Sequence, residues 1–73
     1  MANKQRTLEL FAQAVVRYQN LYPDMRYGQA VFNVMHCWFP ERANKLRGTE
    51  LDPFHRDNRV DEFVKACIVD YEA

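Results

Sequence analysis

The sequence predicts an all-α fold: a small bundle of three to four helices with a polar turn before the last helix. Apolar residues recur at spacings of three and four along most of the chain, which is the pattern of amphipathic helices. Prolines 23, 40 and 53 and glycine 48 divide the chain into four segments. The 73 residues, 48% of them apolar, are expected to form one helical domain, residues 1–73.

The first segment, residues 3–21, is predicted to be a helix because one of its faces is apolar. Pro23 ends this helix, since the residue before a proline avoids the helical region. Asn3 or Thr7 is expected to cap its start. The apolar face consists of Leu8, Phe11, Val15, Tyr18 and Tyr22.

The second segment is predicted to be a helix over residues 25–38, with Asp24 as its N-cap. Inside such a helix Gly28 costs roughly 1 kcal/mol relative to alanine, and we expect the close approach of another helix to be the reason for it. The apolar side consists of Tyr27, Val31, Val34, Met35 and Trp38.

The third segment is a short predicted helix over residues 40–47. Pro40 suits the first helical position, and Gly48 suits the left-handed position that follows a helix. The side chains expected to face inward are Ala43 and Leu46, and those expected to face outward are Arg42 and Lys45.

The polar loop, residues 47–57, leads to the last helix. Its Asp52–Pro53 step favours a turn, and Leu51 and Phe54 are expected to insert into the core. Asp57 or Asn58 is predicted to cap the last helix. That helix has the clearest apolar stripe of the chain: Val60, Phe63, Val64, Cys67, Ile68 and Tyr71.

Two polar regions are candidates for binding. Arg26, Gln29, Asn33 and His36 form one row on the second helix, which is either a surface that binds a carboxylate, phosphate or amide, or an ordinary solvated helix face. In the polar loop, Arg47 can pair with Asp52 or Asp57 and hold the turn in place. Alternatively, Arg47 and Thr49 extend the row on the second helix into one binding surface.

Two aromatic residues, Phe32 and Phe39, fall outside the apolar stripe of the second helix. Exposed aromatic side chains of this kind indicate a surface for a protein partner. The alternative is that other helices cover the second helix on more than one side. The candidate binding residues are therefore Arg26, Gln29, Phe32, Asn33, Phe39, Arg47 and Thr49.

Several kinds of chemistry lack support in the sequence. His36, Cys37, His55 and Cys67 do not have the spacing of a zinc site, so we expect no metal and no cofactor. The chain contains no serine, and adjacent helical residues such as His36 and Cys37 point about 100° apart. We therefore expect a protein that is not an enzyme.

Charge and hydropathy limit the partners. Ten basic and ten acidic residues cancel, although residues 1–40 are basic and residues 60–73 acidic, so that the two parts can attract each other within one fold or between two copies. No apolar run approaches the roughly 20 residues of a membrane span, and no signal peptide is recognisable. We expect a cytoplasmic protein with reduced thiols and no membrane partner.

The motifs R-Y-G-Q-A at residues 26–30, L-R-G-T at 46–49, D-P-F at 52–54 and D-x-R at 57–59 occur in order, with Asn33 after the first. This pattern resembles that of a group of short uncharacterised proteins encoded by bacteriophages, prophages and bacterial genomes. The resemblance covers residues 26–59 and implies a phage-type origin, but no activity. The sequence departs from the pattern at Val60–Asp61, where many of these proteins have an apolar residue followed by proline.

Together these observations favour a small non-enzymatic accessory protein that binds another protein, from the host or the phage, with a homodimer compatible with the same surface. The first alternative is a nucleic-acid-binding regulator, although zero net charge disfavours it. The second alternative is a binder of a small anionic ligand such as a nucleotide. The residues for nucleic acid would be Arg42, Lys45, Arg47, Arg56 and Arg59, and those for the anion Arg26, Gln29, Asn33, Arg47 and Thr49.

Overall fold

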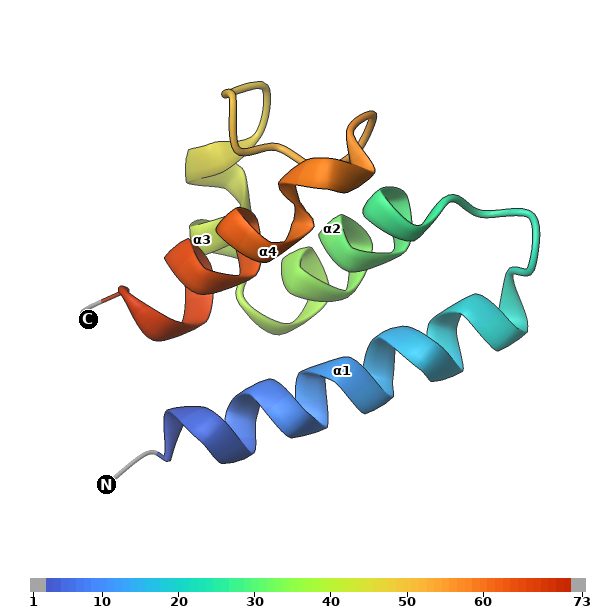
Figure 1. Ribbon diagram of the computed structural model, residues 1–73, viewed down its shortest axis with the longest axis horizontal. Coiled ribbons are helices and arrows are strands. Elements are labelled where there is room, and N and C mark those ends of the chain that lie inside the picture. Colours follow the sequence, from blue (N-terminus) through green and yellow to red (C-terminus); the bar gives the residue numbers. More distant parts are fainter. Residues whose placement is uncertain (1–2, 72–73) are drawn as a thin grey trace.

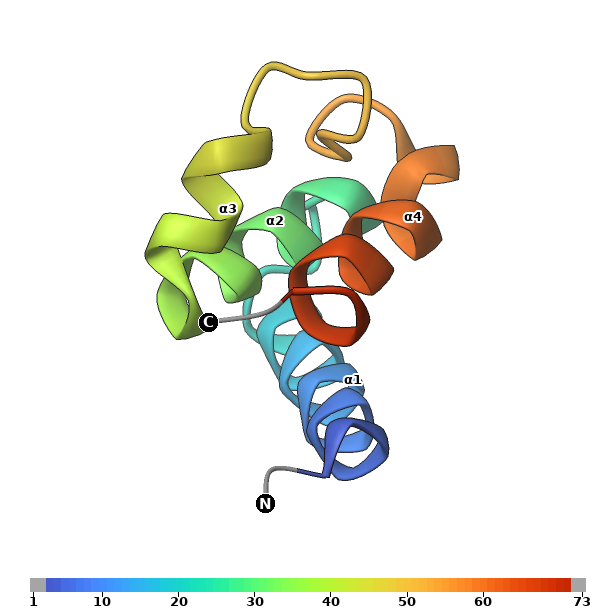
Figure 2. The same cartoon turned by 90° about the vertical axis from the view of Figure 1, so that its left-hand side faces the viewer.

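The computed structural model describes residues 3–71 and confirms the all-α prediction. Figure 1 shows a long α1 along one edge and the shorter helices on one side of it; Figure 2 shows α3 and α4 on either side of α2. In this part of the chain there is no strand. The elements are α1 (Lys4–Leu21), α2 (Tyr27–Trp38), α3 (Pro40–Leu46), a 3₁₀ turn (Asp57–Arg59), α4 (Val60–Val64) and a π-helical turn (Lys65–Val69).

The start of α1 confirms one of the two predicted caps. The side chain of Asn3 accepts a hydrogen bond from the backbone N–H of Arg6 at 3.2 Å, while the hydroxyl of Thr7 donates to the carbonyl of Asn3. The helix ends at Leu21, directly before the Tyr22–Pro23 step, as the sequence predicts.

The start of α2 corrects the prediction that Asp24 is its N-cap. The helix begins at Tyr27, because residues 22–25 first form a turn in which the N–H of Met25 donates to the carbonyl of Tyr22 at 3.0 Å. Arg26 then takes the extended N-cap conformation, and the side-chain oxygen of Gln29 accepts its backbone N–H at 3.4 Å. The proline turn thus delays the helix beyond Asp24.

The core is built around α2. Val31 and Met35 of this helix are almost completely buried, and Phe11 and Val15 of α1 pack against the same cluster. The last helical segment adds its predicted stripe, of which Val64 and Tyr71 are half-buried and the remainder fully buried: Val60, Phe63, Cys67 and Ile68. Tyr27 and Trp38, by contrast, remain 46% and 38% exposed at the two ends of α2.

Phe32 is not exposed, which decides between the two interpretations of the aromatic residues outside the apolar stripe. Its side chain is only 3% exposed, because the ring stacks on Phe63 at a centroid distance of 5.7 Å and meets Phe54 edge-on at 6.0 Å. Phe39 is half-buried and packs against the core. Other segments therefore cover α2 on more than one side, which was the alternative explanation for its surplus aromatic residues.

Arg42 of α3 was predicted to face outward, and this is also wrong. One guanidinium nitrogen donates to the carbonyl of Cys67 at 3.0 Å, and the guanidinium carbon lies 4.1 Å from the ring centres of both Phe39 and Tyr71. A cation at this position satisfies a carbonyl in the last turn of the last helix and opposes the negative end of its dipole. Arg42 therefore fastens α3 to the C-terminal end of the fold.

The last helix changes its hydrogen-bond pattern after Val64. The backbone N–H of Asp70 donates to the carbonyl of Lys65, five residues earlier, at 2.9 Å. This is the spacing of a π-helix, which is rare and usually confined to single turns. Among residues 3–71, none of the helices combines the length and apolar character that crossing a membrane requires.

Candidate protein-binding groove

The polar row on α2 is partly used inside the fold. The side-chain amide of Asn33 is half-buried and donates to the hydroxyl of Tyr18 at 3.2 Å, which ties α2 to α1. Its second contact is to the sulfur of Met25 at 3.5 Å. His36 packs its ring beside Phe32 with 6.2 Å between centroids. This row is therefore not an independent binding surface along its whole length.

The structure separates the predicted binding residues. A cleft of about 460 Å³ brings Phe32 and Asn33 of α2 together with Arg47 of the polar loop. The loop also contributes Gly48, Asp52, Phe54 and His55 to this cleft. The other four predicted binding residues do not line it: Arg26, Gln29, Phe39 and Thr49.

The carboxylate of Asp52 organises the start of the polar loop. One of its oxygens accepts the backbone N–H of Gly48 at 2.6 Å, and the other accepts that of Phe54 at 2.9 Å. Gly48 has the predicted left-handed conformation, with φ of 77°, and the hydroxyl of Thr49 donates to the carbonyl of Leu46 at 2.6 Å. These bonds give the loop a structural role, one of the two readings that the sequence left open.

The predicted ion pair from Arg47 to Asp52 or Asp57 is wrong. Both aspartates accept bonds from backbone N–H groups, and the guanidinium of Arg47 instead lies 5.2 Å from the centre of the Phe32 ring. In the described chain, ion pairs join only residues three apart on one helical segment: Arg6 to Glu9 and Arg59 to Glu62.

The prediction that Asp57 or Asn58 caps the last helix is wrong as well. The carboxylate of Asp57 reaches across the fold and accepts the backbone N–H of Gly28 at 2.9 Å, while α4 continues from a 3₁₀ turn without a side-chain cap. A Cβ atom on Gly28 would lie 2.8 Å from that carboxylate and would clash with the carbonyl oxygen of Pro53. The close approach expected at Gly28 is confirmed, but it is made by the loop rather than by a helix.

Pro53 is the loop residue that fills the core. It is among the side chains with less than 2% exposure, whereas Leu51 and Phe54, which were expected to insert, are half-buried. A buried proline has no backbone N–H that needs a partner. The loop can therefore turn inward at Pro53 without leaving an unsatisfied donor.

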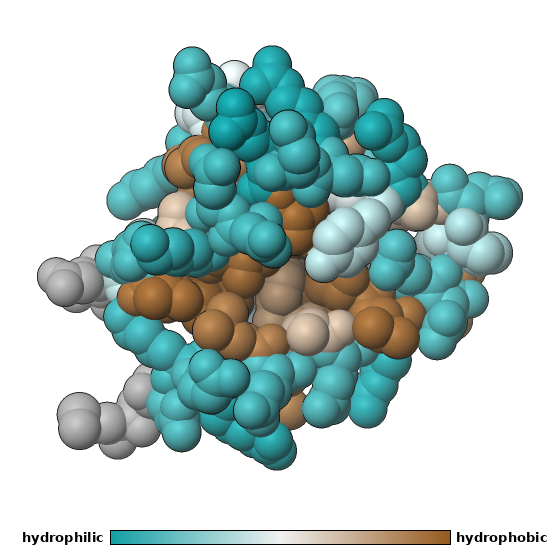
Figure 3. Space-filling view, viewed as in Figure 1, coloured by the Kyte–Doolittle hydropathy of each residue, from teal (hydrophilic) through white to brown (hydrophobic). Residues whose placement is uncertain are grey.

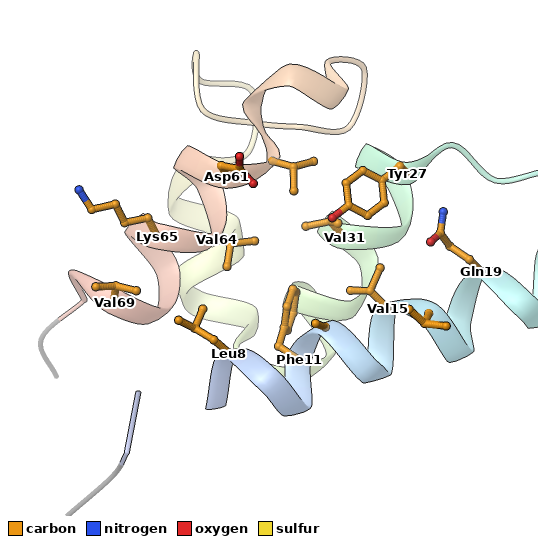
Figure 4. A pocket seen from close by; sticks show the side chains of 13 residues that line it. Leu8, Phe11, Val15, Gln19, Tyr27, Val31, Asp61, Val64, Lys65 and Val69 are labelled. Atoms are coloured by element: carbon orange, nitrogen blue, oxygen red, sulfur yellow. The ribbon is translucent and has the colours of Figure 1, made fainter. Parts of the chain in front are cut away.

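A groove of about 430 Å³, which we call the valine groove, lies between α1 and the last helix (Figure 4). Tyr27 and Val31 of α2 form its floor. The α1 wall consists of Leu8, Phe11, Ala12, Val15, Val16 and Gln19, and the opposite wall of Val60, Asp61, Val64, Lys65 and Val69.

The walls of the groove are apolar and accessible. Six of the thirteen lining residues are valine, and Val16 is 57% exposed on the α1 side. Figure 3 shows the corresponding band of apolar residues between α1 and the helices above it. The charged groups at the groove are Asp61 and Lys65, both exposed and both on the wall formed by the last helix.

The sequence signal for this groove is the width of the apolar stripe on α1. The α1 wall follows positions 8, 11, 12, 15, 16 and 19, which is a continuous helical stripe. Leu8, Phe11 and Val15 form the half of this stripe that packs toward the core. Ala12, Val16 and Gln19 extend that stripe beyond what α2 covers, so the apolar face of α1 is wider than its contact.

The thiols differ in their surroundings. Cys37 is exposed and Cys67 is buried, and they form no disulfide. Burial raises the pKa of the Cys67 thiol from its ordinary value of 9.0 to about 11, an effect that the positive charge of Arg42 partly offsets. Within residues 3–71, no three His, Cys, Asp or Glu side chains are grouped so that they could hold a metal ion.

Comparison of the chain with models of known protein families, with curated proteins and with solved structures finds no match.

Proposed function

We propose that this protein acts by binding another protein chain, and that the valine groove holds an amphipathic helix of that chain. The single observation behind the proposal is an apolar groove that is open to solvent between two helices. Apolar patches that remain exposed on small proteins mark interaction surfaces. An amphipathic helix in an apolar groove is a recurrent mode of protein recognition.

The dimensions of the groove suit a helix. Its α1 wall runs from Leu8 to Gln19, which corresponds to roughly 16 Å at 1.5 Å per residue, or about three helical turns. The valines on both walls have few rotamers, so they hold a fixed surface and lose little freedom when a partner binds. Three turns of helix provide three or four apolar side chains for such a surface.

The other functions predicted from the sequence have less support. Of the five cations proposed for nucleic acid, Arg42 is held between two aromatic rings, and Arg59 pairs with Glu62. Of the five residues proposed for an anion, only Asn33 and Arg47 line one cleft, and they share it with the carboxylate of Asp52, which repels an anion. The phage-type origin and the cytoplasmic location remain predictions.

A designed helical peptide tests the proposal. We expect a 14-residue amphipathic peptide with leucines along one face to shift the amide NMR signals of Val16, Tyr27 and Val64, residues from all three sides of the groove. Val16→Arg places a charge on the exposed α1 wall and should weaken binding about tenfold or more, because the arginine must be desolvated.

Leu10→Arg is the matched control. Leu10 is 40% exposed on the same helix but does not line the groove, so this variant should bind the peptide like the unmodified protein. Equal affinities of the Val16→Arg and unmodified proteins, or peptide-induced shifts confined to residues outside the groove, would contradict the proposal.

A further inference from the structure

The charges at the valine groove lie on one wall only. Asp61 and Lys65 are four residues apart on the last helix, which places them on the same face one turn apart. Figure 4 shows both at the rim. Neither takes part in an ion pair with residues 3–71. The opposite wall offers only uncharged side chains, such as Val16 and Gln19.

When two copies of a helix lie antiparallel, an acid and a base four residues apart on one copy can face the base and the acid of the other copy. A twofold axis at the level of residue 63, on the helix face that carries Asp61 and Lys65, places Asp61 of one copy opposite Lys65 of the second copy, and the reverse pair forms on the other side of the axis. This is the reciprocal contact of an isologous interface, in which residue i meets residue j and j meets i.

We propose that the chain filling the valine groove is a second copy of this protein, with the two last helices antiparallel and joined by two reciprocal ion pairs between Asp61 and Lys65. The inference rests on the proposed function, because it names the partner of the same groove. Each copy lays the solvent-facing side of its last helix, with the half-buried Val64 and Val69, along the groove of the other copy. The result is a two-layer arrangement of four helices.

The overall charges agree with this arrangement. In the dimer, α1 of one copy faces the last helix of the other. Residues 4–21 carry three basic side chains and one acidic side chain, whereas residues 60–69 carry two acidic side chains and one basic side chain. Within one copy no ion pair joins these two segments over the described residues. Arg6 and Glu62 each pair within their own segment or its neighbouring turn, and Lys4 donates to the carbonyl of Val69. The charges that are available to a second copy are therefore those of Arg17, Asp61 and Lys65.

Self-association also suits the size of the chain. A domain of this length buries a smaller fraction of its surface than a larger protein does, and small domains are commonly supplemented by oligomerisation. Covering the groove in two copies at once buries the apolar walls around Val16 and Val64 twice, and thereby extends the shared core across the interface.

Sedimentation equilibrium of four proteins tests the proposal. We expect the unmodified chain to dimerise at micromolar to millimolar concentration. Asp61→Lys and Lys65→Asp each turn two attractive contacts into two repulsive ones, so each variant should weaken the dimer about tenfold or more. The double variant Asp61→Lys/Lys65→Asp should restore it, because both reciprocal pairs form again with the charges exchanged.

Mixing the two single variants gives the sharpest result. Neither should dimerise well alone, but a 1:1 mixture should form a heterodimer. One chain then has lysine at both positions and the other has aspartate at both, so that both contacts across the interface are attractive. Both positions are exposed, so folding should be retained, which circular dichroism checks. Glu41→Lys, an exposed charge reversal on α3 away from the groove, is the matched control and should leave the dimer unchanged.

The outcomes separate this inference from the proposed function. The protein could stay monomeric up to millimolar concentration and still bind the designed helical peptide in the groove. That result would contradict the proposal that the partner is a second copy, but not the proposed function. A dimer that is insensitive to both charge reversals overturns the antiparallel arrangement. A chain that neither dimerises nor binds the peptide contradicts the proposed function as well.

Discussion

The polar loop and the valine groove both border α2, and they use their side chains in opposite ways. In the loop, the carboxylates of Asp52 and Asp57 accept bonds from backbone N–H groups of the same chain. In the groove, apolar side chains on two helices remain partly uncovered. The comparison shows that the charged side chains of a loop can be bound within the fold, while the concave surface that stays open to solvent is apolar.

The largest expected effect concerns the contact between the loop and α2. Gly28→Ala should destabilise the protein by about 3 kcal/mol, because the added Cβ meets the carbonyl of Pro53 and the carboxylate of Asp57 and displaces the buried Pro53. This cost exceeds the roughly 1 kcal/mol that alanine gains over glycine in a helix. Urea unfolding followed by circular dichroism measures the change.

Gly48→Ala is the matched control for that variant. No atom lies within 4 Å of a Cβ built on Gly48, so only its left-handed backbone is strained, at a cost of roughly 1 kcal/mol. If the two alanine variants were equally stable, the loop would not be locked against α2, and the contrast between the loop and the groove would disappear.

The next effect distinguishes backbone capping from an ion pair within the loop. Asp52→Ala removes acceptors for two backbone N–H groups and should cost about 2 kcal/mol. Arg47→Ala should cost less than about 1 kcal/mol, because the exposed guanidinium has only its contact with the Phe32 ring to lose. Both values come from chemical denaturation of the purified variants.

Glu50→Ala serves as the control for removing a negative charge from the same loop. Glu50 is exposed, so its loss should change the stability by no more than about 0.5 kcal/mol. Equal losses for Asp52→Ala and Arg47→Ala would instead indicate that the two residues act as the ion pair predicted from the sequence.

The smallest effect depends on pH and concerns the last helix. Because the pKa of Cys67 is raised from 9.0 to about 11 in the folded state, the folded protein holds this proton more tightly than the unfolded chain. The resulting stability is complete below pH 9 and is lost as the pH rises toward 11. The loss should amount to about 1 kcal/mol at pH 10.

Thermal unfolding of the protein and of Cys67→Ala between pH 8 and 11 isolates this contribution from that of other groups. The variant has a constant cost from its smaller side chain, but the difference between the two proteins should shrink between pH 9 and 11. A difference that stays constant across this range would show that the Cys67 thiol is not protected from solvent.

The fold was predictable from the sequence because the signals for its helices lie within each helix or directly next to it. Proline and glycine mark the ends of the first three helices, and the last apolar stripe was correct from Val60 to Ile68. The starts of α2 and α4 were not predictable, because they depend on tertiary contacts. Asp57 bonds to Gly28, 29 residues away, in place of capping its own helix.

The site was harder to predict for the same reason. Phe32 lies outside the apolar stripe of α2, but the spacing of residues along one helix does not show which other segments pack against it. The polar loop and the last helix cover that side of α2 through Phe54 and Phe63. The valine groove arises from the spacing between α1 and the last helix, which no single segment specifies. Only the unusually wide apolar face around Ala12 and Val16 pointed to it.

The π-helical turn at Lys65–Val69 determines which residue of the last helix completes the groove. Continued α-helical winding would rotate Ile68 toward the face that carries Asp61 and Lys65, since residues three and four apart share a face. With one more residue in the turn, Ile68 stays in the core and Val69 takes the place at the groove. The rim of the groove is thus set by the winding of the backbone as well as by the order of the side chains.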